Sequence, residues 1–279
     1  MNRSARTELA GQTVDIVGKG HYTVPGGRTV DIAGVVRACL EGTRFFPPED
    51  LERLRREVLS QSGSGHETTF EVRNETTLEG IARLLARRQG PVAALNFASA
   101  KNPGGGFLGG SQAQEESLAR SSALYASLLR CGEYYQRHRA SPSLLYSDAM
   151  ILSPGCPIIR NGAGELLNEP QLATFITSAA PNAGATGRNR PSDLPHIPEV
   201  LRRRSEYVLA LAASEWYKQL VLGAWGCGIF GNNPELVAGV FADHLRRGAW
   251  SGRFDHVVFS VFDRSAGGET LAAFERAFA

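Results

Sequence analysis

The chain has 279 residues, a formal net charge of +2 and 42% hydrophobic residues. This length suits one large α/β domain, or one domain with a substantial extension. The near-neutral charge argues against the dense basic face by which many proteins bind DNA or RNA, so no direct nucleic-acid partner is expected. The arginine run at 202–204 lies in a helical pattern and is interpreted as a solvated helix face.

The four cysteines, at positions 39, 131, 156 and 227, lie far apart in sequence and form no CxxC pair. Free thiols of this kind are typical of a reducing compartment. The six histidines lack the HExxH spacing of a zinc site, so no metal and no other cofactor is expected. No stretch approaches the roughly 20 apolar residues of a membrane span, and the N-terminus lacks the apolar core of a signal peptide. We therefore expect a cytoplasmic monomer without a membrane partner.

Residues 1–65 are predicted to form an N-terminal, mostly helical extension. Within it, HYTVPGGRTVDI indicates two short strands around a Pro-Gly-Gly turn. Two helices should follow, over IAGVVRACLEG and over PEDLERLRREVLSQ, and Pro48 suits the start of the second helix. The next residues, QSGSGHE, indicate a flexible link.

From about residue 66 strands and helices are predicted to alternate. Strands are predicted over TTFEVRN, PVAALNFAS, DAMILSPGCPII, QLATFITSA, QLVLGAW and FDHVVFSVFD, the last of which is expected to close the chain. Helices are predicted over TLEGIARLLARR, EESLARSSALYASLLR, PEVLRRRSEYVLALAASEWY and NPELVAGVFADHLRR, with a long polar loop at NAGATGRNRPSDLPHIP. This order predicts an α/β fold whose central, mostly parallel or mixed sheet is covered by helices on both faces.

Two glycine-rich loops each follow an apolar strand and precede a helix. They are NPGGGFLGGSQAQEES, over residues 102–117, and GCGIFGN, over residues 226–232. Ligands bind open α/β sheets outside the carboxyl ends of strands, where glycines let backbone N–H groups approach an anion. Neither loop fits the P-loop GxxxxGK[ST] or the dinucleotide GxGxxG pattern, and one glycine loop alone is often structural. Together the two loops predict a phosphate-bearing ligand, with a diphosphate held from both sides.

Two adjacent carboxylates, Glu115 and Glu116, end the first loop. A glutamate pair in the first turn of a helix is ordinarily explained by the helix dipole. Here the pair follows a loop built for backbone approach, and Gln114 precedes it, which favours a role in the chemistry. Adjacent helical residues project about 100° apart, so the pair cannot act as an opposed acid and nucleophile. One could hold a substrate hydroxyl while the other transfers a proton, and a carboxylate beside a phosphate is shifted towards its protonated form.

The pattern GGG, seven residues and then QEE resembles the signature of poly(ADP-ribose) glycohydrolases. The surrounding LNFASAKNPGGGFLGGSQAQEESLARSSALY and the later LVLGAWGCGIFGNNPELVA resemble the bacterial-type branch, from about Thr68 to Asp263. The resemblance implies an ADP-ribose-binding macrodomain core over residues 66–279, a three-layer α/β/α sandwich with a central mixed sheet. It further implies exo hydrolysis of the ribose–ribose bonds of poly(ADP-ribose), which releases ADP-ribose. The implied partners are poly(ADP-ribose) and poly-ADP-ribosylated proteins, in the reversal of ADP-ribosylation after DNA damage.

The same resemblance implies roles for individual residues around the first loop. Glu116 would be the general acid that protonates the leaving 2′ oxygen and then activates water, while Glu115 would orient ribose hydroxyls. Its action in the transition state makes Glu116 matter more for rate than for affinity. The substrate's diphosphate, adjoining ribose and terminal ribose would be contacted by Asn102, Gly104, Gly105, Gly106, Phe107 and Gln114.

Further roles are implied for the second loop and for the adenine end of the ligand. The second diphosphate loop would be formed by Gly226, Cys227, Gly228, Ile229 and Phe230, and Phe230 would also press on the terminal ribose. No histidine adjoins Cys227 in sequence, so this residue is interpreted as a packing residue and not as a nucleophile. Glu75 would receive the adenine amino group. Phe262 would stack on adenine, although ordinary core packing explains this position almost as well.

Three other functions stay open on sequence alone. They are a non-catalytic ADP-ribose reader, a hydrolase of protein-linked mono-ADP-ribose, and a nucleotide-sugar or cyclic-phosphate hydrolase on the same fold. The intact QEE counts against the reader, and mono-ADP-ribosyl hydrolases of this fold usually lack such a helix. Only a glycohydrolase would release free ADP-ribose from the polymer.

Overall fold

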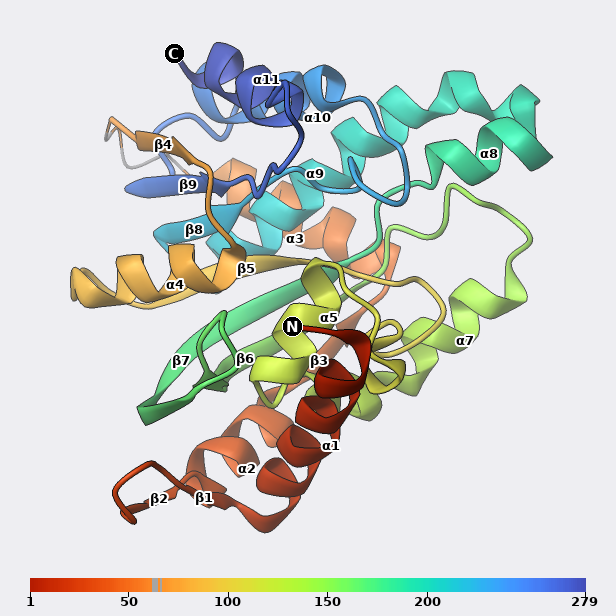
Figure 1. Ribbon diagram of the computed structural model, residues 1–279. Coiled ribbons are helices and arrows are strands. Elements are labelled where there is room, and N and C mark those ends of the chain that lie inside the picture. Colours follow the sequence, from red (N-terminus) through yellow and green to blue (C-terminus); the bar gives the residue numbers. More distant parts are fainter. Residues whose placement is uncertain (62–64, 66) are drawn as a thin grey trace.

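The computed structural model describes residues 1–61, 65 and 67–279 (Figure 1). Its centre is a seven-stranded sheet with the strand order β3-β6-β7-β5-β8-β9-β4. The strands of the sheet are β3 (Arg44–Phe46), β4 (Thr69–Arg73), β5 (Val92–Phe97), β6 (Met150–Arg160), β7 (Leu166–Ser178), β8 (Gln219–Leu222) and β9 (His256–Ser260). The strands from β7 to β4 run parallel to one another, and β6 is antiparallel to both β7 and β3. The predicted mixed sheet is therefore confirmed.

Helices cover both faces of this sheet. The helices are α1 (Arg3–Lys19), α2 (Ala33–Gly42), α3 (Pro48–Ser60), α4 (Thr77–Ala86), α5 (Gln114–Ser121), α6 (Leu124–Leu128), α7 (Gly132–Ala140), α8 (Ala183–Asn189), α9 (Ile197–Ser214), α10 (Pro234–Ala242) and α11 (Glu269–Phe278). Along β5, Ala93 and Leu95 join one core with α3, α9, α10 and α11, while Val92 and Ala94 join the other core with α2, α4, α5, α6 and α7. Alternate residues of β5 therefore enter the two cores, as expected of a strand that is buried on both faces. The helices on one face, the sheet, and the helices on the other face form the three layers.

The predicted helix EESLARSSALYASLLR is wrong as a single helix. It divides into α5 and α6 because Ser122 leaves the helix and forms an antiparallel bridge with Ile158 of β6. A short α5 is the result, and its first turn carries the glutamate pair at the end of β5. No local sequence feature forces the break, since the partner strand lies more than thirty residues further along the chain.

Three other predictions need correction. The polar loop NAGATGRNRPSDLPHIP contains α8, whose first turn is capped by Asn182, and a 3₁₀ helix over Pro191–His196. The strand β9 does not close the chain, because α11 follows it. In the arginine run, Arg204 is fully buried and not solvated, since its guanidinium pairs with Asp148 at 2.8 Å. The predicted link QSGSGHE falls largely outside the described residues.

The N-terminal region is tied to the rest of the molecule in two ways. The predicted hairpin is present as β1 (His21–Thr23) and β2 (Thr29–Asp31), and the two predicted helices are α2 and α3. Sequence reasoning missed α1, which packs beside α5 (Figure 1), and β3, which adds an edge strand to the central sheet. The residues that α1 buries are the small side chains Ala10 and Thr13. This helix therefore lacks the stripe of large apolar residues by which a helix is predicted from sequence. The predicted boundary at residue 65 stays a prediction.

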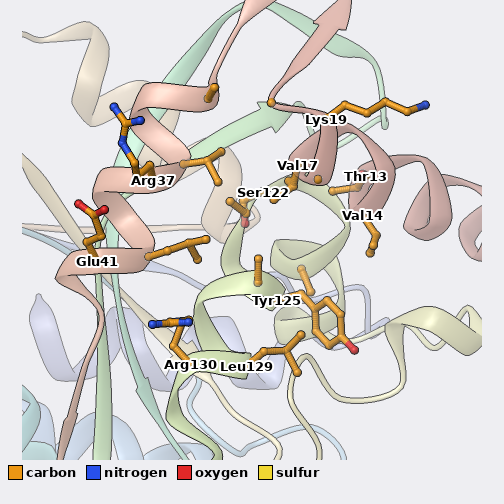
Figure 2. A pocket seen from close by; sticks show the side chains of 18 residues that line it. Thr13, Val14, Val17, Lys19, Arg37, Glu41, Ser122, Tyr125, Leu129 and Arg130 are labelled. Carbon is orange, nitrogen blue, oxygen red and sulfur yellow. The ribbon is translucent and has the colours of Figure 1, made fainter.

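A groove of about 660 Å³ lies where α1 and α2 meet the segment from α5 to Arg130 (Figure 2). Its walls include the apolar side chains of Val14, Val17 and Leu129, and charged side chains stand around it, among them Lys19 and Arg37. Within the residues that the structure describes, no helix has the length and apolar character needed to cross a membrane.

Candidate active site

A larger cleft, of about 740 Å³, lies at the carboxyl ends of β5, β8 and β9. This is the edge at which ligands bind open α/β sheets. Of the residues predicted for the site, the cleft is lined by Gln114, Glu115, Glu116, Gly226, Cys227, Gly228, Ile229, Phe230 and Phe262. The structure thus brings the second loop and the QEE turn together from segments more than a hundred residues apart. The lining does not include the other predicted positions, which are Glu75, Asn102, Gly104, Gly105, Gly106 and Phe107.

Two glycines of the first loop, Gly105 and Gly106, form a seat for Glu116. The backbone of Gly105 has φ of +60°, and a Cβ placed there would lie 2.3 Å from Glu116 Oε1. The N–H of Gly106 donates to the same oxygen at 3.1 Å. Glycine is therefore required here because the loop closes on the glutamate that follows it. The first loop holds a carboxylate in place within the protein itself, which explains why glycines and glutamates share this stretch.

Phe107 fixes the first loop to the protein interior. Its ring is buried and packs against Tyr125, with ring centroids 4.8 Å apart. The Phe107 ring does not line the cleft, and the ligand contact predicted for it stays a prediction. Asn102 is exposed on the loop, and its carbonyl accepts a hydrogen bond from Gly105 N at 3.0 Å.

Glu115 also lines the cleft, but it is held from the protein side. Its side chain is 2% exposed, and its two oxygens accept hydrogen bonds from Asn96 Nδ2 at 3.2 Å and from the Ser99 N–H at 2.6 Å. Burial raises the pKa of this carboxyl to about 8; the two donors work against the rise, and the neighbouring Glu116 adds to it. Sequence reasoning missed Asn96, although a fully buried asparagine within the apolar run PVAALNFAS is the kind of signal that could have found it.

The raised pKa of Glu115 predicts a specific pH dependence of stability. Because the folded state holds this proton up to about pH 8 while the ordinary pKa is 4.5, the free energy of unfolding should fall as pH rises between those values. Glu115→Gln removes the titration, so its stability should fall less over that window. Urea unfolding at pH 5 and pH 8 measures the difference. Glu275→Gln, at an exposed position, is the control, and equal pH slopes for wild type and Glu115→Gln would contradict the assignment.

Gln114 fixes the start of α5. Its Oε1 accepts from the Phe97 N–H at 2.9 Å, and its Nε2 donates to Leu95 O at 2.8 Å and to Thr77 Oγ1 at 3.1 Å. Both ends of the amide are thus engaged within the protein, with β5 and α4. Through these bonds Gln114 sets the direction in which the two following glutamates point.

The second loop is fixed at its base and open at its tip. Gly226 has φ of +73°, and a Cβ there would lie 2.4 Å from Asn232 Nδ2, which donates to the Gly226 carbonyl and to Pro181 O. Asn232 is buried and was missed by the sequence analysis. At the tip, Ile229 is 81% exposed and lines the cleft.

Two side chains of the second loop, Cys227 and Phe230, have different surroundings. Burial raises the pKa of the Cys227 thiol to about 12, so it stays protonated at neutral pH and is not an activated nucleophile. The packing interpretation of Cys227 fits this environment. Phe230 is partly exposed, and its ring lies 6.0 Å from that of Tyr146, measured between centroids.

The two residues predicted for adenine have different surroundings. Phe262 is 53% exposed in the cleft, with the Arg264 guanidinium 4.6 Å from its ring centroid, so ordinary core packing is excluded as its role. Glu75 does not line the cleft. Its carboxylate is bound by Arg83 at 2.7 Å and by Ser260 Oγ at 3.0 Å, and the adenine contact predicted for it gains no support.

The chemistry available in the cleft follows from these positions. One carboxylate is buried and holds its proton, and the next faces the cleft on a rigid glycine seat. Across the described ranges 1–61, 65 and 67–279, no three His, Cys, Asp or Glu side chains gather in a way that could hold a metal ion. The arrangement supports acid–base chemistry beside an anionic ligand.

Comparison with known proteins identifies the family to which the chain is similar. The sequence matches the model of the microbial-type PARG catalytic domain over residues 10–161, which is more than half of the chain. The poly(ADP-ribose) glycohydrolase (PARG) structure from Thermomonospora curvata has 48% sequence identity and a TM-score of 0.94, covering 99% of this chain and 100% of that one. The same enzyme bound to the inhibitor ADP-HPD gives a TM-score of 0.92 at the same identity and coverage.

A second bacterial enzyme is also similar. The poly(ADP-ribose) glycohydrolase of Deinococcus radiodurans in complex with ADP-ribose has 47% identity and a TM-score of 0.83, covering 89% of this chain and 98% of that one. None of the curated proteins compared with the sequence matches it significantly. With its sandwich fold, its glycine loops and its paired glutamates, the chain belongs to the family of microbial-type poly(ADP-ribose) glycohydrolases.

Proposed function

We propose that the protein hydrolyses the ribose–ribose O-glycosidic bonds of poly(ADP-ribose) from the chain end and releases ADP-ribose. The observation that carries the proposal is the pair Glu115 and Glu116, one buried and one facing a cleft that the second glycine loop also lines. Membership of the glycohydrolase family supports it, as does the binding of ADP-ribose by the Deinococcus radiodurans relative.

In the proposed mechanism Glu116 acts as the acid and then as the base. It donates its proton to the 2′ oxygen of the leaving ribose as the bond to the anomeric carbon breaks. The terminal ribose becomes oxocarbenium-like, and its positive charge is stabilised by the nearby diphosphate. Glu116, now ionised, takes a proton from the attacking water and returns to its starting state. The Gly106 N–H holds Glu116 in place throughout.

Glu115 and the second loop are assigned to binding. The diphosphate would lie against the N–H groups of the loop Gly226–Phe230, since exposed glycine backbone allows this close approach. Glu115, fixed by Asn96 and Ser99, would orient the ribose hydroxyls. Adenine would stack on Phe262, whose ring is exposed in the cleft.

The part of the cleft beside Phe262 supports exo cleavage, in which the polymer is hydrolysed from its terminus. Asp263 accepts hydrogen bonds from the N–H groups of Thr270 and Leu271, which fixes the start of α11 beside Phe262. Asp263, Arg264 and Thr270 all line the cleft there. We therefore propose that this segment limits how far the polymer can extend beyond the adenosine of the bound unit.

Phe230→Ala should lower kcat/KM for polymer by about 10- to 100-fold, because the ring that aims the anomeric carbon is lost. Since Phe230 is partly exposed, we expect a loss of stability smaller than the roughly 3–5 kcal/mol typical of a buried Phe→Ala change. Steady-state kinetics and urea unfolding measure the two effects. Phe45→Ala, which removes a partly buried ring outside the cleft lining, is the control. Loss of activity only in proportion to loss of folded protein would contradict the role.

The decisive comparison of substrates uses two modified proteins. One carries poly(ADP-ribose), and the other carries a single ADP-ribose unit. We expect free ADP-ribose from the polymer while the protein-linked unit remains. Release of the single unit would favour a mono-ADP-ribosyl hydrolase, and binding of both without cleavage would favour a reader.

We also propose the setting in which the activity is used. The protein would act in the cytoplasm as a monomer, on poly-ADP-ribosylated proteins formed in the DNA damage response, and without a metal or cofactor. Four free cysteines support a reducing compartment. Residue 65 is proposed as the boundary between the extension and the macrodomain core of residues 66–279.

A further inference from the structure

We infer that Arg6, Arg120 and Arg160 form a second anion site in the cleft, which binds the diphosphate of the adjoining ADP-ribose unit on the leaving side of the scissile bond. All three side chains line the cleft, and none belongs to the loops that the sequence analysis assigned to phosphate. The inference rests on the proposed function and adds to it the position of the second unit of the polymer.

The first observation is burial without an ion pair. Arg120 and Arg160 are 6% and 5% exposed, and in the part of the chain that the structure describes no ion pair involves these two residues or Arg6. Their hydrogen-bond acceptors are all neutral: Ser111 O, Gln112 Oε1 and Ser117 Oγ for Arg120; Thr13 Oγ1, Gly164 O and Gln12 Oε1 for Arg160; and Gly110 O and Met1 O for Arg6.

A comparison within the same chain shows that this arrangement is unusual. Arg204 is also fully buried, but Asp148 pairs with it at 2.8 Å. A buried charge without such a partner is costly, and burial lowers the pKa of both Arg120 and Arg160. The charge of Arg6 lowers the pKa of Arg120 further, because the two guanidinium groups repel each other, while the charge of Glu116 raises it. An incoming anion would offset both the cost of burying these charges and the repulsion between Arg6 and Arg120.

The second observation is the place of the three arginines relative to Glu116. Arg120 follows Glu116 by four residues on α5, so both lie on the same helix face, about 6 Å apart along the axis. Thr13 Oγ1 donates to Arg120 O at 2.6 Å and accepts from Arg160 Nε at 3.1 Å, which connects the second and third arginine. The cluster thus adjoins the proposed acid along α5.

The short distance between Glu116 and the arginines suits the chemical structure of poly(ADP-ribose). The leaving 2′ oxygen and the diphosphate of the adjoining unit are carried by the same adenosine ribose, a few bonds apart. When Glu116 protonates that oxygen, the diphosphate must lie close by, and a guanidinium fork matches phosphate oxygens. Arg6 has an Nη2 group that makes none of the hydrogen bonds found among the described residues, so it can donate to a ligand.

Arg6 offers the sharpest test, because Arg3 is a natural control. Both arginines lie on α1, and both hold the first loop through a carbonyl: Arg6 Nε donates to Gly110 O at 2.7 Å, and Arg3 Nε donates to Gly109 O at 2.9 Å. Arg6 lines the cleft and Arg3 does not. A role in positioning the loop would affect both variants, whereas a role in binding the anion affects Arg6 alone.

We expect Arg6→Gln to raise KM for poly(ADP-ribose) about tenfold with kcat within about twofold, and to reduce the salt dependence of kcat/KM. Affinity for ADP-ribose, which lacks the second diphosphate, should not change. Arg6→Lys should recover part of the loss, and Arg3→Gln should keep the wild-type KM. Equal rises of KM in Arg3→Gln and Arg6→Gln, or a parallel loss of ADP-ribose affinity, would overturn the site.

A binding measurement separates this site from the catalytic proposal. In the Glu116→Gln background, an ADP-ribose dimer should bind about tenfold more tightly than ADP-ribose, and adding Arg6→Gln should abolish that advantage. If this holds while the wild-type protein releases no ADP-ribose from polymer, the anion site stands and the proposed function fails. If wild type cleaves polymer but the dimer has no advantage, the function stands and the anion site is wrong.

Discussion

Glu116→Gln is expected to lower the rate of polymer hydrolysis by about 10³-fold while changing ADP-ribose affinity less than about threefold. The amide keeps the shape of the carboxylate, and its oxygen can still accept the Gly106 N–H, so the loop should not move. What is lost is the proton that Glu116 gives to the leaving oxygen and later takes from water. Single-turnover kinetics and calorimetric titration with ADP-ribose measure the two quantities.

The matched control is Glu133→Gln, which makes the same change at an exposed position of α7. It should leave both rate and affinity at the wild-type level. A Glu116→Gln rate within tenfold of wild type would show that another group supplies the proton. An equal loss of rate and of ADP-ribose affinity would instead assign Glu116 to ground-state binding.

Gly105→Ala should have the second largest effect, a loss of activity of about 100-fold. The added methyl group would lie 2.3 Å from Glu116 Oε1, so the carboxylate has to leave the Gly106 N–H. Alanine also tolerates φ of +60° poorly, at a cost of roughly 1 kcal/mol or more. Kinetics on polymer and a thermal melt distinguish the displaced acid from a general loss of stability.

Gly239→Ala is the control for that variant. A Cβ at Gly239 meets no atom within 4 Å, and this residue lies within α10, where alanine is the better helix former. Its activity should equal that of wild type. If Gly105→Ala were as active as wild type, the first loop would not be the seat of Glu116.

The sequence alone was sufficient to identify the glycine loop and the glutamate pair, which lie within one short stretch. The contact of Gly105 and Gly106 with Glu116 was not predicted, because these glycines were expected to hold the diphosphate. The strands that carry both loops were also predictable, because buried apolar runs bounded by glycine are local signals. Ile229 and Phe262 are exposed and line the cleft, and their contact with the ligand stays a prediction.

Residues that reach the site from distant segments could not be predicted in this way. Arg6 of α1 donates to Gly110 O of the first loop, more than a hundred residues further along the chain. Arg160, at the end of β6, is connected to Arg120 only through Thr13 of α1, and no spacing in the sequence indicates either contact. Asn96 and Asn232 lie within the predicted strand and the predicted loop, so their positions were within reach of the sequence, but their hydrogen-bond partners Glu115 and Gly226 are set by the fold. The break of the predicted helix at Ser122 likewise depends on a strand that only tertiary structure brings near.

The most direct test of the account is a time course of purified poly(ADP-ribose) with the wild-type protein, with the products resolved by chromatography. Free ADP-ribose is expected from the earliest time points, at a rate that Glu116→Gln lowers by about 10³-fold. Binding of ADP-ribose without any release from polymer would contradict it, and would make the protein a reader whose paired glutamates serve binding alone.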